Sequence, residues 1–356
     1  MSESTPTPTA NGNSAPPRLI DVAHQAGVSP ATVSRVLNHS GPVNTATRER
    51  VRAAMAALGY VQTPAPPSAT PSNRTIAVFI TDILNPVFPE FLRGIEDEIG
   101  TQPIAMQVHN VAENSPAEKQ PHAVLTKHQV DGVIAIASHL AAADLIALHE
   151  QLALPVVVVN RRLNHPSLPC IVVDFEDAAY RSALYLTGLG HRRIGFLAGF
   201  GSAYTSQNRK RGIERALAEV DATLPAKWHL NCFPSIEGGF QAMSLLLALP
   251  TAERPSAIIA FNDVVAFGAL HALRAHGLRV PEDMSVIGCD GIALAAHSNP
   301  PLTTIDQPKY RMGRLAMQTL HKLLEGDTSV GGGFMLMESP LITRESTAPY
   351  APTPVT

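Results

Sequence analysis

The chain has 356 residues, of which 45% are hydrophobic and 16% charged, and its formal net charge at pH 7 is −3. This length exceeds one ordinary domain and predicts at least two. The sequence contains no run of about 18 or more apolar residues, which argues against a membrane span. Cys170, Cys232 and Cys289 lie on or beside apolar runs and form no Cys-x-x-Cys motif or His/Cys cluster, so we expect reduced thiols and no metal site.

Residues 1–17 are rich in Ser, Thr, Pro and Asn. They contain neither a basic n-region nor an apolar h-region, the two parts of a secretory signal. We therefore predict a disordered tail and a cytoplasmic protein.

Residues 18–61 predict three short helices around one small core. Gly27 ends the first helix, Ser29 caps the second with Pro30 at its first position, and Asn44 caps the third. The apolar residues fall on one face of each helix, at Leu19, Val22, Ala23 and Ala26, at Val33, Val36 and Leu37, and at Val51, Ala54, Met55 and Leu58. This pattern predicts a helix-turn-helix, whose second helix enters the DNA major groove.

Charge agrees with a nucleic-acid partner for this segment alone. Residues 18–60 contain five arginines and no lysine against Asp21 and Glu49, a net charge of +3 in a chain that is acidic as a whole. A small helical bundle with solvated arginines would give the same count, so charge alone leaves both interpretations open.

Residues 62–73 have the composition of a Pro-rich linker, and strands alternate with helices beyond them. Buried strands alternating with helices predict parallel sheets covered on both faces, and about ten strands favour two sheets over one. The predicted strands are 75–80, 104–111, 132–137, 156–160, 171–174, 193–198, 228–233, 257–261 and 285–290. The predicted helices are 87–99, 117–128, 142–152, 177–189, 207–220, 239–249 and 264–276.

The run DVAHQAGVSPATVSRVLN, followed by TRERV and ALGY, resembles the headpiece of the lactose/galactose/purine repressor family of bacterial transcription regulators. The resemblance extends from Arg18 to Glu345. It implies an all-α headpiece and an α/β core of two Rossmann-like subdomains of periplasmic-binding-protein type. The chain would cross between them near Asp174, near 299–303 and near 326–333.

On this basis the core is expected at 74–346 and a frayed tail at 347–356. The first subdomain would comprise 74–173 and 303–326, and the second 174–302 and 327–346. The chain departs from the family in its linker, where Ala69 replaces the leucine of a hinge helix and Pro64, Pro66 and Pro67 disfavour any helix. It also departs at Arg18, where the family usually has Thr.

Ligands of open α/β sheets bind beyond the carboxyl ends of the strands. Polar residues follow several predicted strands, and together with the resemblance they imply an effector site at Phe88, Arg161, Asp174, Thr205, Arg209, Asn262 and Asp290. Structural alternatives stay open: Asn262 as a helix cap, Asp290 as a turn residue, Arg209 as part of a charged helix face, and Arg161 pointing away.

On the headpiece, Arg35 is the best candidate for reading a base, because Arg bidentate to guanine is the commonest specific contact. Pro30 and Ala31 occupy the specificity-setting positions of the family and are both small and apolar. Contacts to phosphates or base edges are expected from Thr32, Ser34, Asn38, Asn44 and Thr47, with simple solvation as the alternative for Thr32 and Ser34.

The sequence thus predicts a ligand-responsive regulator, a repressor by resemblance, that binds a pseudo-palindromic operator on double-stranded DNA as a homodimer. Its effector would be a sugar, sugar acid or similar small polar metabolite, and no cofactor is expected. A periplasmic-type sugar-binding protein is the alternative, but it predicts a signal peptide and no headpiece. An enzyme is a third interpretation, for which GxSxG, HExxH and a phosphate-binding GxGxxG are all absent.

Overall fold

The computed structural model describes residues 19–37, 43–58, 60, 74–111, 121, 125, 129–138, 140–200, 204–327 and 329–351. It divides into two units, 1–72 and 73–356, which are described separately. Asn38, the linker 62–73, both tail ends and most of the predicted helix 117–128 lie outside the described residues. Within the described ranges, no helix combines the length and apolar character that crossing a membrane requires.

The headpiece contains the three helices that the sequence predicts: α1 (Leu19–Ala26), α2 (Pro30–Leu37) and α3 (Thr45–Leu58). Gly27 has a φ of 63° after α1, a conformation that glycine adopts without steric cost. Ser29 Oγ accepts a hydrogen bond from the Thr32 N–H at 3.2 Å, and Asn44 Oδ1 accepts from the Thr47 N–H at 2.8 Å. Both predicted N-caps are therefore formed. Three valines from the three helices, Val22, Val33 and Val51, are fully buried together.

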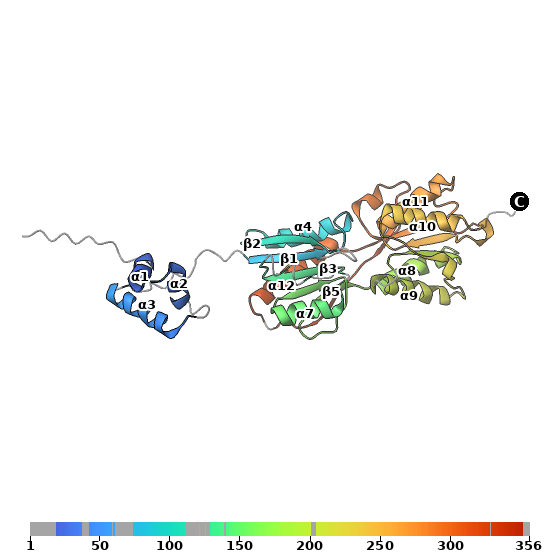
Figure 1. The fold of residues 1–356 in the computed structure, drawn as a ribbon. Helices are drawn as coiled ribbons and strands as arrows, with labels where there is room; N and C mark the ends of the chain where they lie inside the picture. The colour runs from blue at the N-terminus through green and yellow to red at the C-terminus, as the bar shows by residue number, and fades with distance from the viewer. Residues whose placement is uncertain are drawn as a thin grey trace, which may run out of the picture. The chain divides into compact units, whose positions relative to one another are not determined.

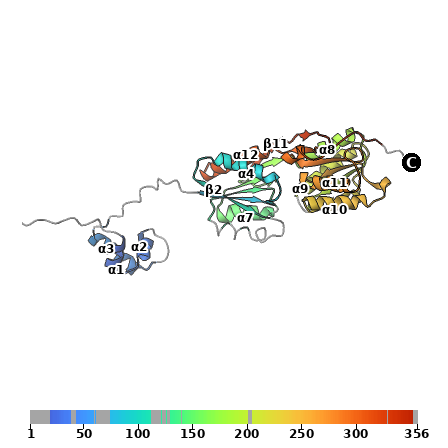
Figure 2. The same ribbon diagram turned by 90° about the horizontal axis from the view of Figure 1, so that it is seen from above.

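The first sheet of the core has the strand order β11-β5-β4-β3-β1-β2, with every pair parallel. Its strands are β1 (Arg74–Ile80), β2 (Ile104–Asn110), β3 (Gly132–Ile136), β4 (Val156–Val159), β5 (Pro169–Val173) and β11 (Gly333–Met337). Figure 2 shows α4 (Val87–Ile99) and α12 (Lys309–Leu324) on one face and α7 (Ala142–Leu152) on the other. Burial from both sides explains why β3 and β4 are apolar at every position.

The second sheet has the order β12-β10-β9-β8-β6-β7 and is parallel except for the β10–β12 pair. Its strands are β6 (Ile194–Ala198), β7 (His229–Asn231), β8 (Ala257–Ala260), β9 (Ser285–Asp290), β10 (Thr303–Asp306) and β12 (Leu341–Ile342). Its helices pack in pairs, α8 (Phe175–Gly188) with α9 (Tyr204–Ala218) and α10 (Ile236–Leu247) with α11 (Asp263–Ala275), on opposite sides in Figure 1. Short 3-10 turns are η1 (Ala226–Trp228), η2 (Thr251–Glu253) and η3 (Ala293–Ala296).

Two crossovers differ from the sequence-based expectation. The strand at 303–306 was expected in the first subdomain, but β10 pairs with β9 in the second sheet, so the chain crosses at Gln307 and Pro308. The strand at 333–337 was expected in the second subdomain, but β11 pairs with β5 in the first sheet, so the last crossing lies at 338–340. Both strands are short, and a run of four or five residues does not identify the sheet that it joins.

The C-terminal boundary also differs, because the core does not end at residue 346. The Tyr185 hydroxyl lies 3.1 Å from Thr347 Oγ1, the Ala348 carbonyl bonds the His191 ring at 3.1 Å, and the Tyr350 N–H donates to the Leu189 carbonyl at 2.8 Å. The last described residues are thus tied to the end of α8.

Glycines set the spacing of the helix pairs. A Cβ on Gly268 of α11 would lie 2.1 Å from the Ile236 carbonyl oxygen, and one on Gly313 of α12 would lie 2.2 Å from the Phe91 carbonyl oxygen. Real Cβ atoms do not approach so closely, so these helices can pack at this distance only through glycine.

Candidate functional site

Between the two sheets, at the carboxyl ends of their strands, lies a narrow cavity of about 80 Å³ that we call the cleft cavity. Five of the seven predicted effector residues line it: Phe88, Thr205, Arg209, Asn262 and Asp290. The other two, Arg161 and Asp174, line a separate cavity of about 350 Å³, the outer cavity. Asn160 and Phe175 line both, so the two spaces share a wall.

Two residues lining the cleft cavity have a backbone conformation unusual for their type. Asn160, just after β4, has a φ of 61°, and Asp290, at the end of β9, has a φ of 137°. Non-glycine residues rarely adopt such angles, and those that do cluster at binding and catalytic sites. These backbone conformations occur where each residue lines the cleft cavity, Asn160 after a strand of the first sheet and Asp290 at the end of a strand of the second.

One glutamine joins those two side chains across the crossover. Asn160 Nδ2 donates to Gln307 Oε1 at 2.8 Å, and Gln307 Nε2 donates to Asp290 Oδ1 at 2.6 Å. Asn160 belongs to the first subdomain and Asp290 to the second. The relay therefore links the subdomains directly at the cleft cavity.

Asp290 is one of two buried carboxylates at this point. Burial, reinforced by the nearby charge of Asp263, raises the pKa of Asp290, against the opposing effects of Arg209, Lys309 and Gln307. Burial also raises the pKa of Asp263, although its carboxylate accepts hydrogen bonds from Thr304 Oγ1 at 2.5 Å and from the Ile292 N–H at 2.9 Å. Two buried carboxylates that lie close to one another resist ionising together.

Arg209 is 4% exposed and held by aromatic rings. Its guanidinium lies 4.0 Å from the Phe175 ring centre and 4.5 Å from that of Phe261. It donates to the Thr205 carbonyl at 3.2 Å and to Cys289 Sγ at 3.3 Å, whereas its Nε is buried without a hydrogen-bond partner among the described residues. Asn160 Oδ1 is likewise buried and without a partner in that part of the chain. Two residues that line the cleft cavity thus each carry one buried polar atom without a partner among the described residues.

Three of the predicted effector residues also form hydrogen bonds that stabilise the local backbone. Asn262 Oδ1 accepts from the Val265 N–H at 2.9 Å and caps α11, as the structural alternative from the sequence requires. Asp174 Oδ1 accepts from the N–H groups of Glu176 and Asp177 and caps α8. Arg161 donates to the carbonyls of Ser138 and Leu140, so its guanidinium lies toward the loop after β3.

Sequence reasoning did not assign several residues that line the cleft cavity. They are Phe175, Phe200, Phe261, the crossover residue Gln307, and Asn160, the last residue of the predicted strand 156–160. Gln307 directly follows β10, so the strand-end rule would have found it if the crossover had been placed correctly. Apolar side chains at a strand or helix end carry no comparable signal.

In the headpiece, Pro30, Ala31, Thr32, Ser34 and Arg35 all lie on α2. Pro30 is exposed, and the Thr32 hydroxyl lies 2.9 Å from Ser29 Oγ. Asn44 and Thr47 meet at the start of α3, where Asn44 serves as the cap. Among the described residues, no group of three or more His, Cys, Asp and Glu side chains is arranged to hold a metal ion.

Two known families match parts of the chain. "Bacterial regulatory proteins, lacI family" matches residues 18–63, and "Periplasmic binding protein-like domain" matches residues 183–347. The HTH-type transcriptional repressor CytR of Escherichia coli (strain K12) is 36% identical over 328 residues, which is 92% of this chain and 95% of that protein.

Solved structures agree with this match. A complex of the transcriptional regulator CelR with cellobiose has a TM-score of 0.69 at 29% identity, covering 93% of this chain and 99% of that one. The lac repressor dimer bound to operator and the anti-inducer ONPF has a TM-score of 0.68 at 29% identity, covering 94% and 100%. The headpiece and the two-sheet core thus occur together in proteins of this kind, as the predicted fold class requires.

Proposed function

Because the chain belongs to the lacI family of bacterial regulatory proteins, we propose that it represses transcription from an operator that it binds through α2. A small effector in the cleft cavity would control that binding. The observation that carries the effector part is the pair of buried, unpartnered atoms, Arg209 Nε and Asn160 Oδ1. An unsatisfied buried polar group costs about 1–3 kcal/mol, so an effector that bonded these atoms when it bound would recover that cost.

The DNA contacts are proposed from position on the headpiece. Arg35 on α2 reads a guanine, and Pro30 and Ala31 contact a thymine methyl. Thr32, Ser34, Asn38, Asn44 and Thr47 contact phosphates or base edges and set the position of the helix. The matching lac repressor structure is a dimer on its operator, which supports a homodimer on a pseudo-palindromic site here. We place the protein in the cytoplasm, where DNA is accessible.

The effector is proposed to be a sugar or related small polar metabolite. Hydrogen-bond donors and acceptors for hydroxyl groups come from Thr205, Arg209, Asn262 and Asp290. Phe88 offers an apolar surface. The matching CelR structure holds cellobiose, which supports this chemical class. Arg161 and Asp174 would contact only a ligand that extends into the outer cavity.

The Gln307 relay suggests how binding could alter closure of the cleft. Gln307 bonds both Asn160 and Asp290. An effector that takes over either contact exchanges a bond between subdomains for a bond to ligand. Such an effector shifts the equilibrium between a more open and a more closed arrangement of the two subdomains, by an amount set by the difference in its affinity for the two arrangements.

A thermal-shift screen of the full chain against sugars, sugar acids, sugar phosphates and nucleobases tests this proposal. A ligand of the native state raises the melting temperature by mass action. The hit is then added to an operator-binding titration at fixed salt, and we expect it to change operator affinity. If no compound binds, or a binding compound leaves operator affinity unchanged, the effector role is wrong.

A further inference from the structure

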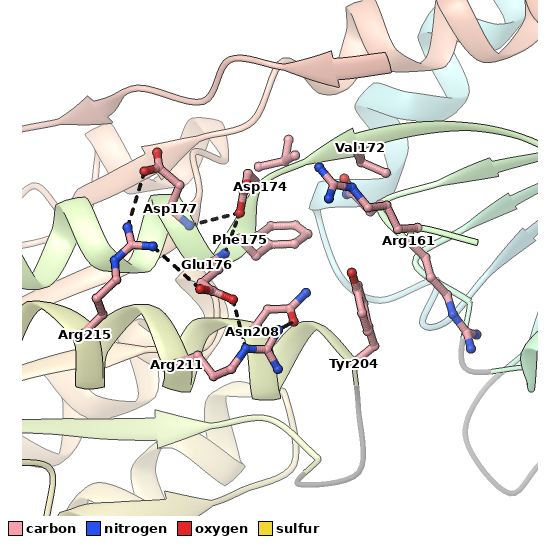
Figure 3. A pocket seen from close by; sticks show the side chains of 13 residues that line it. Arg161, Val172, Asp174, Phe175, Glu176, Asp177, Tyr204, Asn208, Arg211 and Arg215 are labelled. Carbon is pink, nitrogen blue, oxygen red and sulfur yellow. Dashed lines mark hydrogen bonds and ion pairs between the residues drawn. The ribbon is translucent and has the colours of Figure 1, made fainter. Parts of the chain in front are cut away.

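The outer cavity lies beside the cleft cavity and is larger than it. At about 350 Å³ it is within the size range of small-molecule sites. Its walls come from both subdomains: the residues after β4, the end of β5, the start of α8, and α9 from Tyr204 to Arg215. Figure 3 shows Tyr204 with its hydroxyl directed into this space, between Phe175 and Arg161.

The acidic residues of this cavity are already matched by arginines. Glu176 lies 2.9 Å from Arg211 and 3.7 Å from Arg215. Asp177 lies 2.8 Å from Arg181 and 3.8 Å from Arg215. These contacts, most of which Figure 3 draws, form one charge network along α8 and α9. Asp174, the remaining acid, accepts two backbone N–H groups at the start of α8, where the helix dipole favours a negative charge.

Arg161 and Arg162, the two arginines after β4, form no ion pair with a carboxylate of the described residues. Within the described residues, Arg161 contacts only carbonyl oxygens and the ring of Tyr204 lies near it, and Arg162 stacks on the Phe334 ring at 3.7 Å. Burial lowers the pKa of Arg161, against the opposing effects of Tyr204 and Cys170. Stacking on Phe334 fixes the plane of the exposed Arg162 and leaves its N–H edge available.

We propose that the outer cavity is a second subsite that receives an oxyanionic group, phosphate or carboxylate, carried by the effector. The inference rests on the proposal that the cleft cavity is the effector site. An effector bound there would reach the outer cavity past Asn160 and Phe175, the wall that the two cavities share. Arg162 binds the oxyanion through its N–H edge, the geometry that suits carboxylate and phosphate. The Tyr204 hydroxyl donates to the same group, and Arg161 contributes charge.

The test uses the full chain and two simple probes, inorganic phosphate and acetate, titrated by calorimetry at constant ionic strength. At least one should bind saturably, and the tighter probe identifies the group. In Arg162→Met, which keeps a long side chain over Phe334, we expect that affinity to fall about tenfold or more. Arg274→Met, at an exposed arginine of α11 outside both cavities, should bind as wild type does.

A second variant separates this proposal from the effector proposal. Asp290→Asn alters the cleft cavity alone, so it should leave binding of the simple anion unchanged even if it abolishes effector binding. If neither anion saturates wild type, or if Arg162→Met binds it as well as wild type, the subsite is refuted whether or not the cleft cavity binds an effector. A loss of the same size in Arg274→Met would show non-specific charge attraction and would also refute it.

Discussion

Replacing Asp290 with asparagine should stabilise the protein and weaken its effector binding. The substitution keeps the shape of the side chain and removes its charge. Because burial raises the pKa of Asp290, the folded wild type keeps a proton at pH values where the unfolded chain, with aspartates titrating near about 3.9, has released it. Wild-type stability therefore falls as pH rises from about 4 toward the raised folded pKa, and the asparagine variant avoids this loss.

The size of the effect follows from the shift. One pKa unit corresponds to about 1.4 kcal/mol, and burial raises the pKa of Asp290 from its ordinary value to about 8, so between pH 5 and pH 8 the unfolded chain has released a proton that the folded protein still holds. The variant should therefore be more stable than wild type, and its excess in free energy of unfolding should be at least about 1.4 kcal/mol larger at pH 8 than at pH 5. Effector affinity at pH 7, where the folded Asp290 keeps its proton, should fall about 2- to 10-fold, the equivalent of losing a neutral hydrogen bond of about 0.5–1.5 kcal/mol.

Urea unfolding followed by tryptophan fluorescence measures the stability difference. The chain has one tryptophan, Trp228, which is 7% exposed and lies beside the second sheet that carries Asp290. Asp306→Asn is the control, because that half-exposed carboxylate lies 3.4 Å from the same Lys309 that faces Asp290. A stability difference that is equal at both pH values, or larger at pH 5, would contradict the reasoning.

Three further substitutions address the headpiece and the packing. Gly268→Ala should lower the free energy of unfolding by roughly 3 kcal/mol or more, because the added methyl group would overlap the Ile236 carbonyl. Gly188→Ala is the control in the same urea titration: a Cβ there would have nothing within 4 Å, so this variant should be neutral or slightly stabilised. Asn44→Ala should cost about 1 kcal/mol of helix stability, seen as faster amide hydrogen exchange in α3; unchanged exchange would show that the cap contributes nothing. Arg35→Ala should abolish discrimination between operator and random DNA in a binding titration, and retained discrimination would exclude Arg35 as the base reader.

Most elements could be predicted from the sequence because their periodicity is clear. The helices at 87–99 and 142–152 and the strand at 285–290 have the predicted bounds. The two headpiece caps follow from the capping chemistry of Ser29 and Asn44. The family resemblance and the structure agree on an all-α headpiece with a two-sheet core.

The sheet to which a short strand belongs could not be predicted. The run at 303–306 is equally compatible with either sheet, since backbone pairing is not specific to sequence, and only β9 beside it in space decides. The error concealed Gln307, the residue that bridges the cleft. Side-chain direction was equally inaccessible: Arg161 follows a strand as expected, yet its guanidinium is held by the carbonyls of Ser138 and Leu140.

The positions of the crossovers also determine the order in which the core can be completed during synthesis. Five of the six strands of the second sheet lie in the continuous segment 174–306, so this half is nearly complete when Asp306 leaves the ribosome. The first sheet begins earlier but is completed only by α12 and β11, which follow residue 308 in the chain. Until then α4 lacks the helix that packs on it through Gly94, whose Cβ position lies 2.2 Å from the Tyr310 carbonyl oxygen. The first sheet is therefore started first but still lacks a helix and a strand when five strands of the second sheet have been made, and a nascent chain stopped before Lys309 leaves α4, the first helix of the core, without its partner.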